Sequence, residues 1–123
     1  LVGSEMCIRD SYNTKKFPGM INVRGIGPAA FLKLVSEASF VCTDSFHGAC
    51  FSMNFNKSFV VKTSDSAVQS NVRITDLLAR YGIEGCLYRD EVVTSAVDYG
   101  HANQTLSHDR DTARAFIARC IGL

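Results

Sequence analysis

The sequence predicts an α/β fold in which a Rossmann-like parallel sheet is flanked by helices. A short apolar run begins at Phe40, and a compact apolar segment covers Phe46–Phe55. A second run, Phe59–Val61, is rich in β-branched residues. Short runs of this kind are typical of buried strands, whereas the segment between them has the length of a helix. The order strand, helix, strand predicts a parallel pair joined by a crossover helix.

A polar corner, Thr43-Asp44-Ser45, separates the first strand from the helix and predicts a helix N-cap. Ligands of parallel sheets bind outside the carboxyl ends of the strands, which places Asp44, Ser45 and His47 at the ligand edge. The free amides of a first helical turn favour an anion, and the helix dipole disfavours a charged imidazole. His47 is therefore expected to be a neutral base or hydrogen-bond donor. A histidine satisfied within the fold and an Asp44 that only caps the helix are the alternatives.

Helical periodicity predicts three further helices. The first begins with Pro28 at its first position, where a missing N–H costs nothing. The second is capped by Ser70 or Asn71 and ends at Gly82, which places Arg73 in its first turn. The third covers Asp98–Cys120 and is frayed near Gly100. The apolar positions of the three helices are Phe31, Leu34, Val35 and Ala38, then Ile74, Leu77, Leu78 and Tyr81, then Leu106, Ala113, Phe116, Ile117 and Cys120. Cys86–Tyr88 is expected to form a last short strand.

Composition excludes several classes of protein. The chain has 123 residues and a formal net charge of +1, so nothing favours binding to nucleic acid or to an acidic membrane surface. No apolar run approaches the roughly 20 residues of a membrane span. The five cysteines are scattered and form no C-x-x-C pair, which favours buried free thiols over a metal site or a disulfide framework.

Residues 1–11 do not resemble the rest of the chain. The run from Glu5 to Ser11 is similar to the translation of an adapter used in sequencing libraries. We therefore expect residues 1–11 to be a non-native leader and residues 12–123 to form the domain proper. An ordinary N-terminal segment is the alternative.

Two other features bear on chemistry. Arg73 has the planar guanidinium that binds a carboxylate or phosphate with two hydrogen bonds, although a solvated arginine is an equally simple interpretation. Ser45 and Cys50 are possible nucleophiles in residue type, but no G-x-S-x-G motif surrounds them. Covalent catalysis is therefore not expected.

Three ordered blocks resemble the polysaccharide pyruvyl transferase family. The block V-C-T-D-S-F-H-G-A-C-F-S-M-N-F-N-K-S-F-V-V is similar to the family pattern T-D-S-F-H-G-x-x-F-S-x-x-F-x-K-P-F. Downstream, N-V-R-I-T-D-L-L-A-R-Y-G-I is similar to N-S-R-I-x-x-L-L-x-x-L-G-L, and upstream G-P-A-A-F-L-K-L-V-S-E-A-S-F matches a helix and strand. The resemblance covers Gly27 to Tyr88 and concerns only the C-terminal half of a two-domain, glycosyltransferase-B-like enzyme.

The resemblance implies transfer of a pyruvyl group from phosphoenolpyruvate to a sugar of an exopolysaccharide or cell-wall polymer, forming a ketal. It implies His47 and Asp44 as catalytic residues and Ser45, Gly48, Asn71 and Arg73 as substrate-binding residues, with no metal and no cofactor beyond the donor. The expected partners are phosphoenolpyruvate, a saccharide acceptor that can be lipid-linked, and a missing N-terminal domain. The expected location is the cytoplasm, including the inner face of the membrane, and the fragment alone is expected to be inactive.

The sequence departs from the family pattern at three positions. Ser58 replaces a proline, Ala30 replaces a glutamate, and Ser45 stands where well-studied branches have an arginine in an R-L-H-G motif. The last departure leaves Arg73 as the best candidate to hold the donor. Two other functions remain open: a glycosyltransferase of the same architecture that uses a nucleotide sugar, and a non-catalytic binding module.

Overall fold

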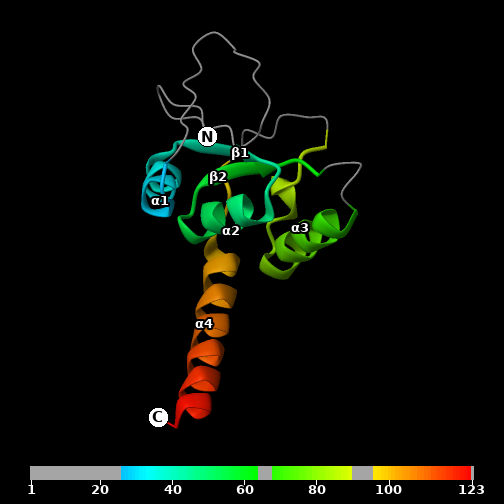
Figure 1. Ribbon diagram of the computed structural model, residues 1–123. Coiled ribbons are helices and arrows are strands. Elements are labelled where there is room, and N and C mark those ends of the chain that lie inside the picture. Colours follow the sequence, from blue (N-terminus) through cyan, green and yellow to red (C-terminus); the bar gives the residue numbers. More distant parts are fainter. Residues whose placement is uncertain (1–25, 64–67, 90–95, 123) are drawn as a thin grey trace.

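The computed structural model describes residues 26–63, 68–89 and 96–122, so the predicted leader at residues 1–11 lies outside the described residues. The elements follow one another as shown in Figure 1: α1 (Pro28–Glu37), β1 (Phe40–Thr43), α2 (Phe46–Asn54), β2 (Ser58–Val61), α3 (Val68–Tyr81), the 3-10 helix η1 (Glu84–Cys86) and α4 (Gly100–Ile121). The chain is thus a mixed α/β protein, as predicted.

The predicted strand–helix–strand unit is confirmed. Strands β1 and β2 pair in parallel, with Phe40 opposite Ser58 and Thr43 opposite Val61, and α2 connects them. Past β2, Leu87 makes a single parallel bridge to Val61, so the strand expected at 86–88 is reduced to one bridged residue. The sheet of the described residues is therefore smaller than a full Rossmann-like sheet, and no second domain is seen among them.

Among the described residues, α1, α2, α3 and the sheet share one hydrophobic core with the beginning of α4. In Figure 1, α2 lies beneath the two strands, with α1 and α3 on either side of it. The apolar stripes predicted for α1 and α3 face this core, because residues three and four apart lie on one side of a helix. The largest fully buried apolar side chains come from α1, β2 and α3: Val35, Val61, Ile74 and Leu78.

Helix α3 begins earlier than the sequence predicts. It starts at Val68, so Ser70 and Asn71 lie inside the helix and do not cap it, and Arg73 lies in the second turn, not the first. The polar stretch before Ile74 has no apolar periodicity, so the pattern of apolar residues could not predict that the helix begins at Val68. The predicted end is confirmed, since Gly82 follows the helix with a left-handed φ of 67°.

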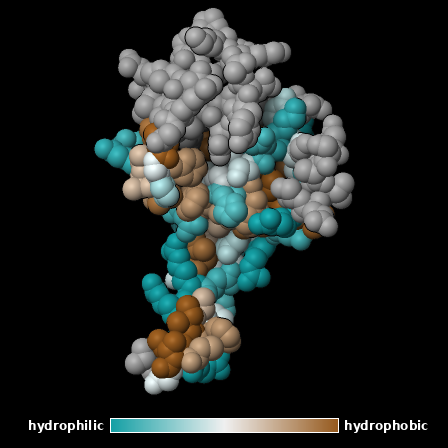
Figure 2. Space-filling model, in the orientation of Figure 1, coloured by the Kyte–Doolittle hydropathy of each residue, from teal (hydrophilic) through white to brown (hydrophobic). Residues whose placement is uncertain are grey.

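Helix α4 is anchored at its beginning and exposed at its end. The Tyr99 hydroxyl, just before the helix, donates to the carbonyl oxygen of Lys57 at 2.5 Å, and Ala102 is buried in the core. The rest of the helix runs away from the sheet (Figure 1). Hydrophobic surface gathers near its far end (Figure 2), where Phe116, Ile117 and Ile121 are each more than half exposed. The predicted apolar stripe therefore has no cover over this part of the described structure.

The predicted burial of the cysteines is only partly correct. Cys86 is buried and Cys50 is half-buried, but Cys42 and Cys120 are exposed, and all four are free thiols. Within the described ranges, no helix combines the length and the hydrophobicity needed to cross a membrane.

Candidate functional site at the carboxyl edge of the sheet

The candidate site lies where β1 and β2 end. Because the two strands are parallel, Thr43 and Val61 are at the same edge of the sheet, and α2 begins at this edge. Asp44, Ser45 and His47 all lie there and are exposed, as the strand order predicted. In any α-helix the first amides have no carbonyl partner four residues back, and here these amides also lie at this edge.

A fixed corner connects β1 to α2. The Oγ1 atom of Thr43 accepts a hydrogen bond from the Ser45 amide at 3.1 Å, and the Ser45 hydroxyl oxygen accepts from the Gly48 amide at 3.4 Å. A Cβ atom on Gly48 would lie 2.3 Å from Thr43 Oγ1, so the corner can close only over a glycine. This packing gives a structural reason for a threonine and a glycine at these positions of the T-D-S-F-H-G block.

The corner confirms the predicted N-cap and decides between the residues that were possible caps. The N-cap of α2 is Ser45, whose side chain accepts from the helix, and not Asp44. Gly48 is buried and its amide donates to the Ser45 hydroxyl oxygen at 3.4 Å, so its predicted contact with a substrate stays a prediction. Thr43, Asp44 and Ser45 are all residue types that cap helices, and only the three-dimensional path of the chain selects one of them.

Asp44 lies exposed at the surface. Its side chain is exposed, and no donor among the described residues bonds to it. Capping therefore does not explain this carboxylate, and its predicted catalytic role stays a prediction.

The Arg73 side chain reaches this edge, although its backbone lies in the second turn of α3. Its guanidinium carbon lies 4.2 Å from the centroid of the Phe46 ring, in a cation–π contact with the first residue of α2. The same charge acts on Cys50, one turn further along α2: burial raises the pKa of that thiol, and Arg73 partly offsets the rise. Arg73 thus places a positive charge beside α2.

Phe46 joins His47 to Arg73. The imidazole of His47 meets the Phe46 ring edge-on, with centroids 5.7 Å apart and ring planes at 81°. Arg73 packs on the same ring. The imidazole centroid and the guanidinium carbon are therefore no further apart than the sum of their distances to the centroid of the Phe46 ring. The structure therefore brings the two predicted residues together around one ring. Sequence analysis assigned Phe46 only as the first residue of the helix, although its place between Ser45 and His47 in the motif was a signal.

Asn71 is less clearly part of the group formed by His47, Phe46 and Arg73. It lies two residues before Arg73 in α3, and side chains two apart on a helix do not face the same side. Its carbonyl oxygen accepts from the Thr75 hydroxyl at 3.1 Å within the helix. A substrate contact from Asn71 stays a prediction.

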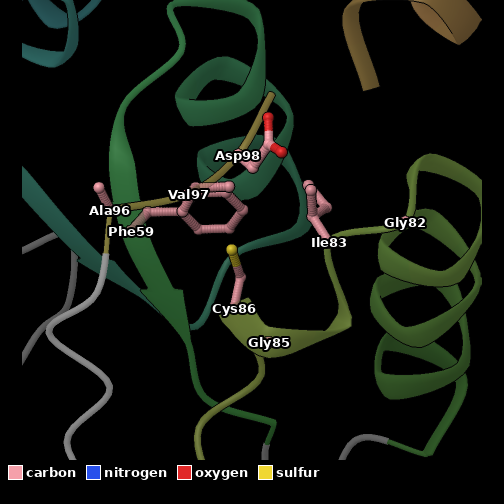
Figure 3. A pocket seen from close by; sticks show the side chains of 8 residues that line it. All are labelled: Phe59, Gly82, Ile83, Gly85, Cys86, Ala96, Val97 and Asp98. Carbon is pink, nitrogen blue, oxygen red and sulfur yellow. The ribbon is translucent and has the colours of Figure 1, made fainter. Parts of the chain in front are cut away.

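A separate cavity of about 200 Å³ lies between Phe59 of β2 and residues 82–86. Figure 3 shows the Cys86 sulfur directed toward the Phe59 ring, with Ile83 beside them. The cavity is lined by Phe59, Gly82, Ile83, Gly85, Cys86, Ala96, Val97 and Asp98, and by none of the predicted site residues. Burial raises the pKa of Cys86 to about 11, so this thiol stays protonated at neutral pH. The cavity is below the usual size of a ligand pocket and is not the predicted site.

The described residues form a mixed α/β fold, and the candidate site lies at the carboxyl edge of its parallel strands, beside the beginning of α2. Comparison with protein families identifies the class: the sequence profile described as polysaccharide pyruvyl transferase matches residues 4–66, just over half of the chain. The chain therefore belongs to the polysaccharide pyruvyl transferase family. Comparisons with the curated proteins and with the solved structures give no match.

The matched range covers part of the candidate site. It includes β1, the corner, α2 and β2, and so includes Asp44, Ser45, His47 and Gly48, whereas Arg73 and Asn71 lie beyond it. The match begins at residue 4, inside the segment expected to be a leader, and the origin of that segment stays a prediction.

Proposed function

We propose that this chain binds phosphoenolpyruvate at the carboxyl edge of its sheet and takes part in transferring the pyruvyl group to a saccharide as a ketal. Membership of the family supports pyruvyl transfer in general. The observation that carries the proposal is the placement of His47 and Arg73 around Phe46, at the beginning of α2. The two residues present a proton-transfer group and a cation to the same small region.

The reaction makes clear demands on such a site. A proton adds to the methylene carbon of the donor, which gives the central carbon oxocarbenium character. Two sugar hydroxyls add to that carbon, and the bond to the phosphate oxygen breaks. Two protons leave the hydroxyls. One makes up for the proton added to the methylene carbon, and the other leaves with the phosphate. The site must therefore move protons and hold two anionic groups.

The residues at the edge can divide these tasks. The Arg73 guanidinium and the first amides of α2 hold the carboxylate and phosphate, because both favour negative charge. His47, exposed in the first turn of α2, is within reach of a donor held there and transfers the proton. Asp44, also exposed, accepts a proton from an attacking hydroxyl. The Ser45 hydroxyl can donate a hydrogen bond to phosphoenolpyruvate while its oxygen accepts from the Gly48 amide and caps α2.

The proposed reaction also involves partners outside this chain. The acceptor is a saccharide, free or lipid-linked, and in the proposal a second domain binds it opposite this edge. Phosphoenolpyruvate is a metabolite of the cytoplasm, so the proposed reaction takes place there, including at the inner face of the membrane. No step of the proposed chemistry requires a cofactor.

A ligand titration tests the proposal against a nucleotide-sugar donor. The chain is titrated with phosphoenolpyruvate and, separately, with a uridine diphosphate sugar, and binding is followed by calorimetry. We expect saturable binding of phosphoenolpyruvate that inorganic phosphate competes for. Binding of the nucleotide sugar with no response to phosphoenolpyruvate would replace pyruvyl transfer by glycosyl transfer, and binding of neither would support a domain without a donor site.

A further inference from the structure

Lys62 lies at the same edge as the candidate site, although it belongs to no sequence motif described above. It directly follows β2, and its amide donates to the carbonyl oxygen of Thr43 at 2.9 Å. This bond fixes the backbone of Lys62 beside the end of β1. Thr43 is also the residue whose hydroxyl orders the corner leading to His47. Lys62 is therefore tied to the first residue of that corner.

The ammonium group of Lys62 has only a weak contact. It lies 5.7 Å from the centroid of the Tyr88 ring, and the side chain is exposed. Over the ranges that the structure describes, no carboxylate lies within ion-pair distance of it. Tyr88 is itself held at the edge, since its amide donates to the Val61 carbonyl oxygen at 2.9 Å. A flexible lysine with so weak a contact can turn toward a ligand at low cost.

The proposed donor needs more positive charge than Arg73 supplies. Phosphoenolpyruvate carries a carboxylate and a phosphate on adjacent carbon and oxygen atoms, and one guanidinium can bind one of these groups with two hydrogen bonds. Arg73 lies on the α3 side of α2, over Phe46. Lys62 lies at the end of β2, and a lysine serves as a mobile point charge for phosphate.

We propose that Lys62 is a second cation of the donor site, which leaves the Tyr88 ring and binds an anionic group of the ligand held at the carboxyl edge. The proposal rests on the proposed function for the identity of the ligand, but not for the existence of an anion site. It assigns to Lys62 a binding role and no part in proton transfer.

The chain offers a matched control for this residue. Lys57 and Lys62 flank the same strand, but Lys57 precedes β2 and so lies at the opposite edge. Its contact with the Tyr99 hydroxyl is made by the backbone carbonyl, which a change of side chain leaves in place. Removing either side chain deletes the same charge, and only one of the two lies at the ligand edge.

The test compares the whole chain with Lys62→Ala, Lys62→Arg and Lys57→Ala at one fixed salt concentration, with thermal melts to verify folding. Each protein is titrated with phosphoenolpyruvate and with inorganic phosphate. We expect Lys62→Ala to raise the Kd for phosphoenolpyruvate by about tenfold, Lys62→Arg to recover most of the affinity, and Lys57→Ala to change it less than about twofold.

The outcomes separate this inference from the proposed function. Equal Kd values for Lys62→Ala and Lys57→Ala would overturn the role of Lys62 and leave phosphoenolpyruvate as the donor. Binding of phosphate that depends on Lys62, without binding of phosphoenolpyruvate, would support the cation and remove the proposed donor. A chain that binds neither anion would overturn both.

Discussion

The guanidinium carbon of Arg73 lies 4.2 Å from the centroid of the Phe46 ring, and the His47 imidazole meets the same ring edge-on at 5.7 Å. The ring therefore sets the spacing between the cation and the proton-transfer group of the proposed site. Arg73 comes from α3 and the other two residues from α2, so the packing of these two helices determines the geometry of the site.

The corner before α2 should tolerate no side chain at Gly48. We expect Gly48→Ala to lower the free energy of unfolding by about 1–3 kcal/mol, the usual cost of overpacking, because its Cβ would meet Thr43 Oγ1. Urea unfolding measures the change. The matched control is Gly85→Ala, since nothing lies within 4 Å of a Cβ there. The loss should shrink when Thr43→Ala is made as well, and an undiminished loss in that double variant would show that the contact is not its cause.

Removing the proposed proton-transfer group should affect turnover more than binding. We expect His47→Ala to lower kcat for pyruvyl transfer by about 100-fold or more, with a Kd for phosphoenolpyruvate within about threefold of the parent. The rate is followed as phosphate release by an active enzyme that contains this sequence. His108→Ala, an exposed histidine of α4, serves as the control. A His47 variant that loses affinity but turns over bound donor normally would make His47 a binding residue.

The contact between α3 and α4 should depend on pH through Asp109. Its carboxylate accepts from Arg80 at 3.1 and 2.6 Å and from the Tyr81 hydroxyl at 2.9 Å, and these bonds hold the pKa of that carboxyl below its ordinary value. A lowered pKa stabilises the fold above the unfolded pKa of about 4, and the contribution is lost as the pH falls through the folded pKa.

Asp109→Asn should therefore be less stable than the parent at pH 7, and the two should converge as the pH falls below about 4. Thermal melts across this range measure the difference. Asp111→Asn is the control, because Asp111 pairs within α4, with an exposed Arg114 at 3.5 Å. If the difference in melting temperature between Asp109→Asn and the parent did not change with pH, the loss of stability would come from packing and not from charge.

The thiols should differ sharply in reactivity. Cys86 is buried and has a pKa of about 11, so little thiolate forms at pH 8 and little of the side chain is accessible to a reagent. Cys42 and Cys120 are exposed. We expect iodoacetamide to modify these two in the folded chain and Cys86 only after unfolding, as measured by peptide mass spectrometry. Rapid modification of Cys86 without denaturant would mean that the reagent reaches the thiol through the cavity beside Phe59 in the folded chain.

Sequence alone predicted the parts of the fold that depend on local signals. The run from Phe40 to Val61 alternates apolar segments with cap and turn residues, and each signal agrees with its neighbours, so strand, helix and strand were placed correctly. The left-handed glycine at the end of α3 was equally local. The exposed face of α4 was not predicted, because periodicity identifies an apolar stripe but not what packs against it.

The position of the candidate residues at the carboxyl edge was predicted, but only part of their contacts was. Strand order alone placed Asp44 and His47 at the carboxyl edge. The choice of Ser45 as cap depends on the path of the chain. The stacking of Arg73 on Phe46 depends on how α3 packs against α2, and residues 27 apart in sequence carry no local signal of that contact.

The central claim is that Arg73 and the beginning of α2 form one anion site. The most direct test titrates phosphoenolpyruvate into the isotope-labelled chain and follows its amide NMR signals, with Arg73→Ala as the test variant and Arg119→Ala, in the last turn of α4, as the charge-matched control. We predict saturable shifts of the Phe46 and His47 amides, and a loss of about 1.5–3 kcal/mol of binding free energy in Arg73→Ala only. Unchanged affinity in Arg73→Ala, or shifts confined to residues away from α2, would contradict the claim.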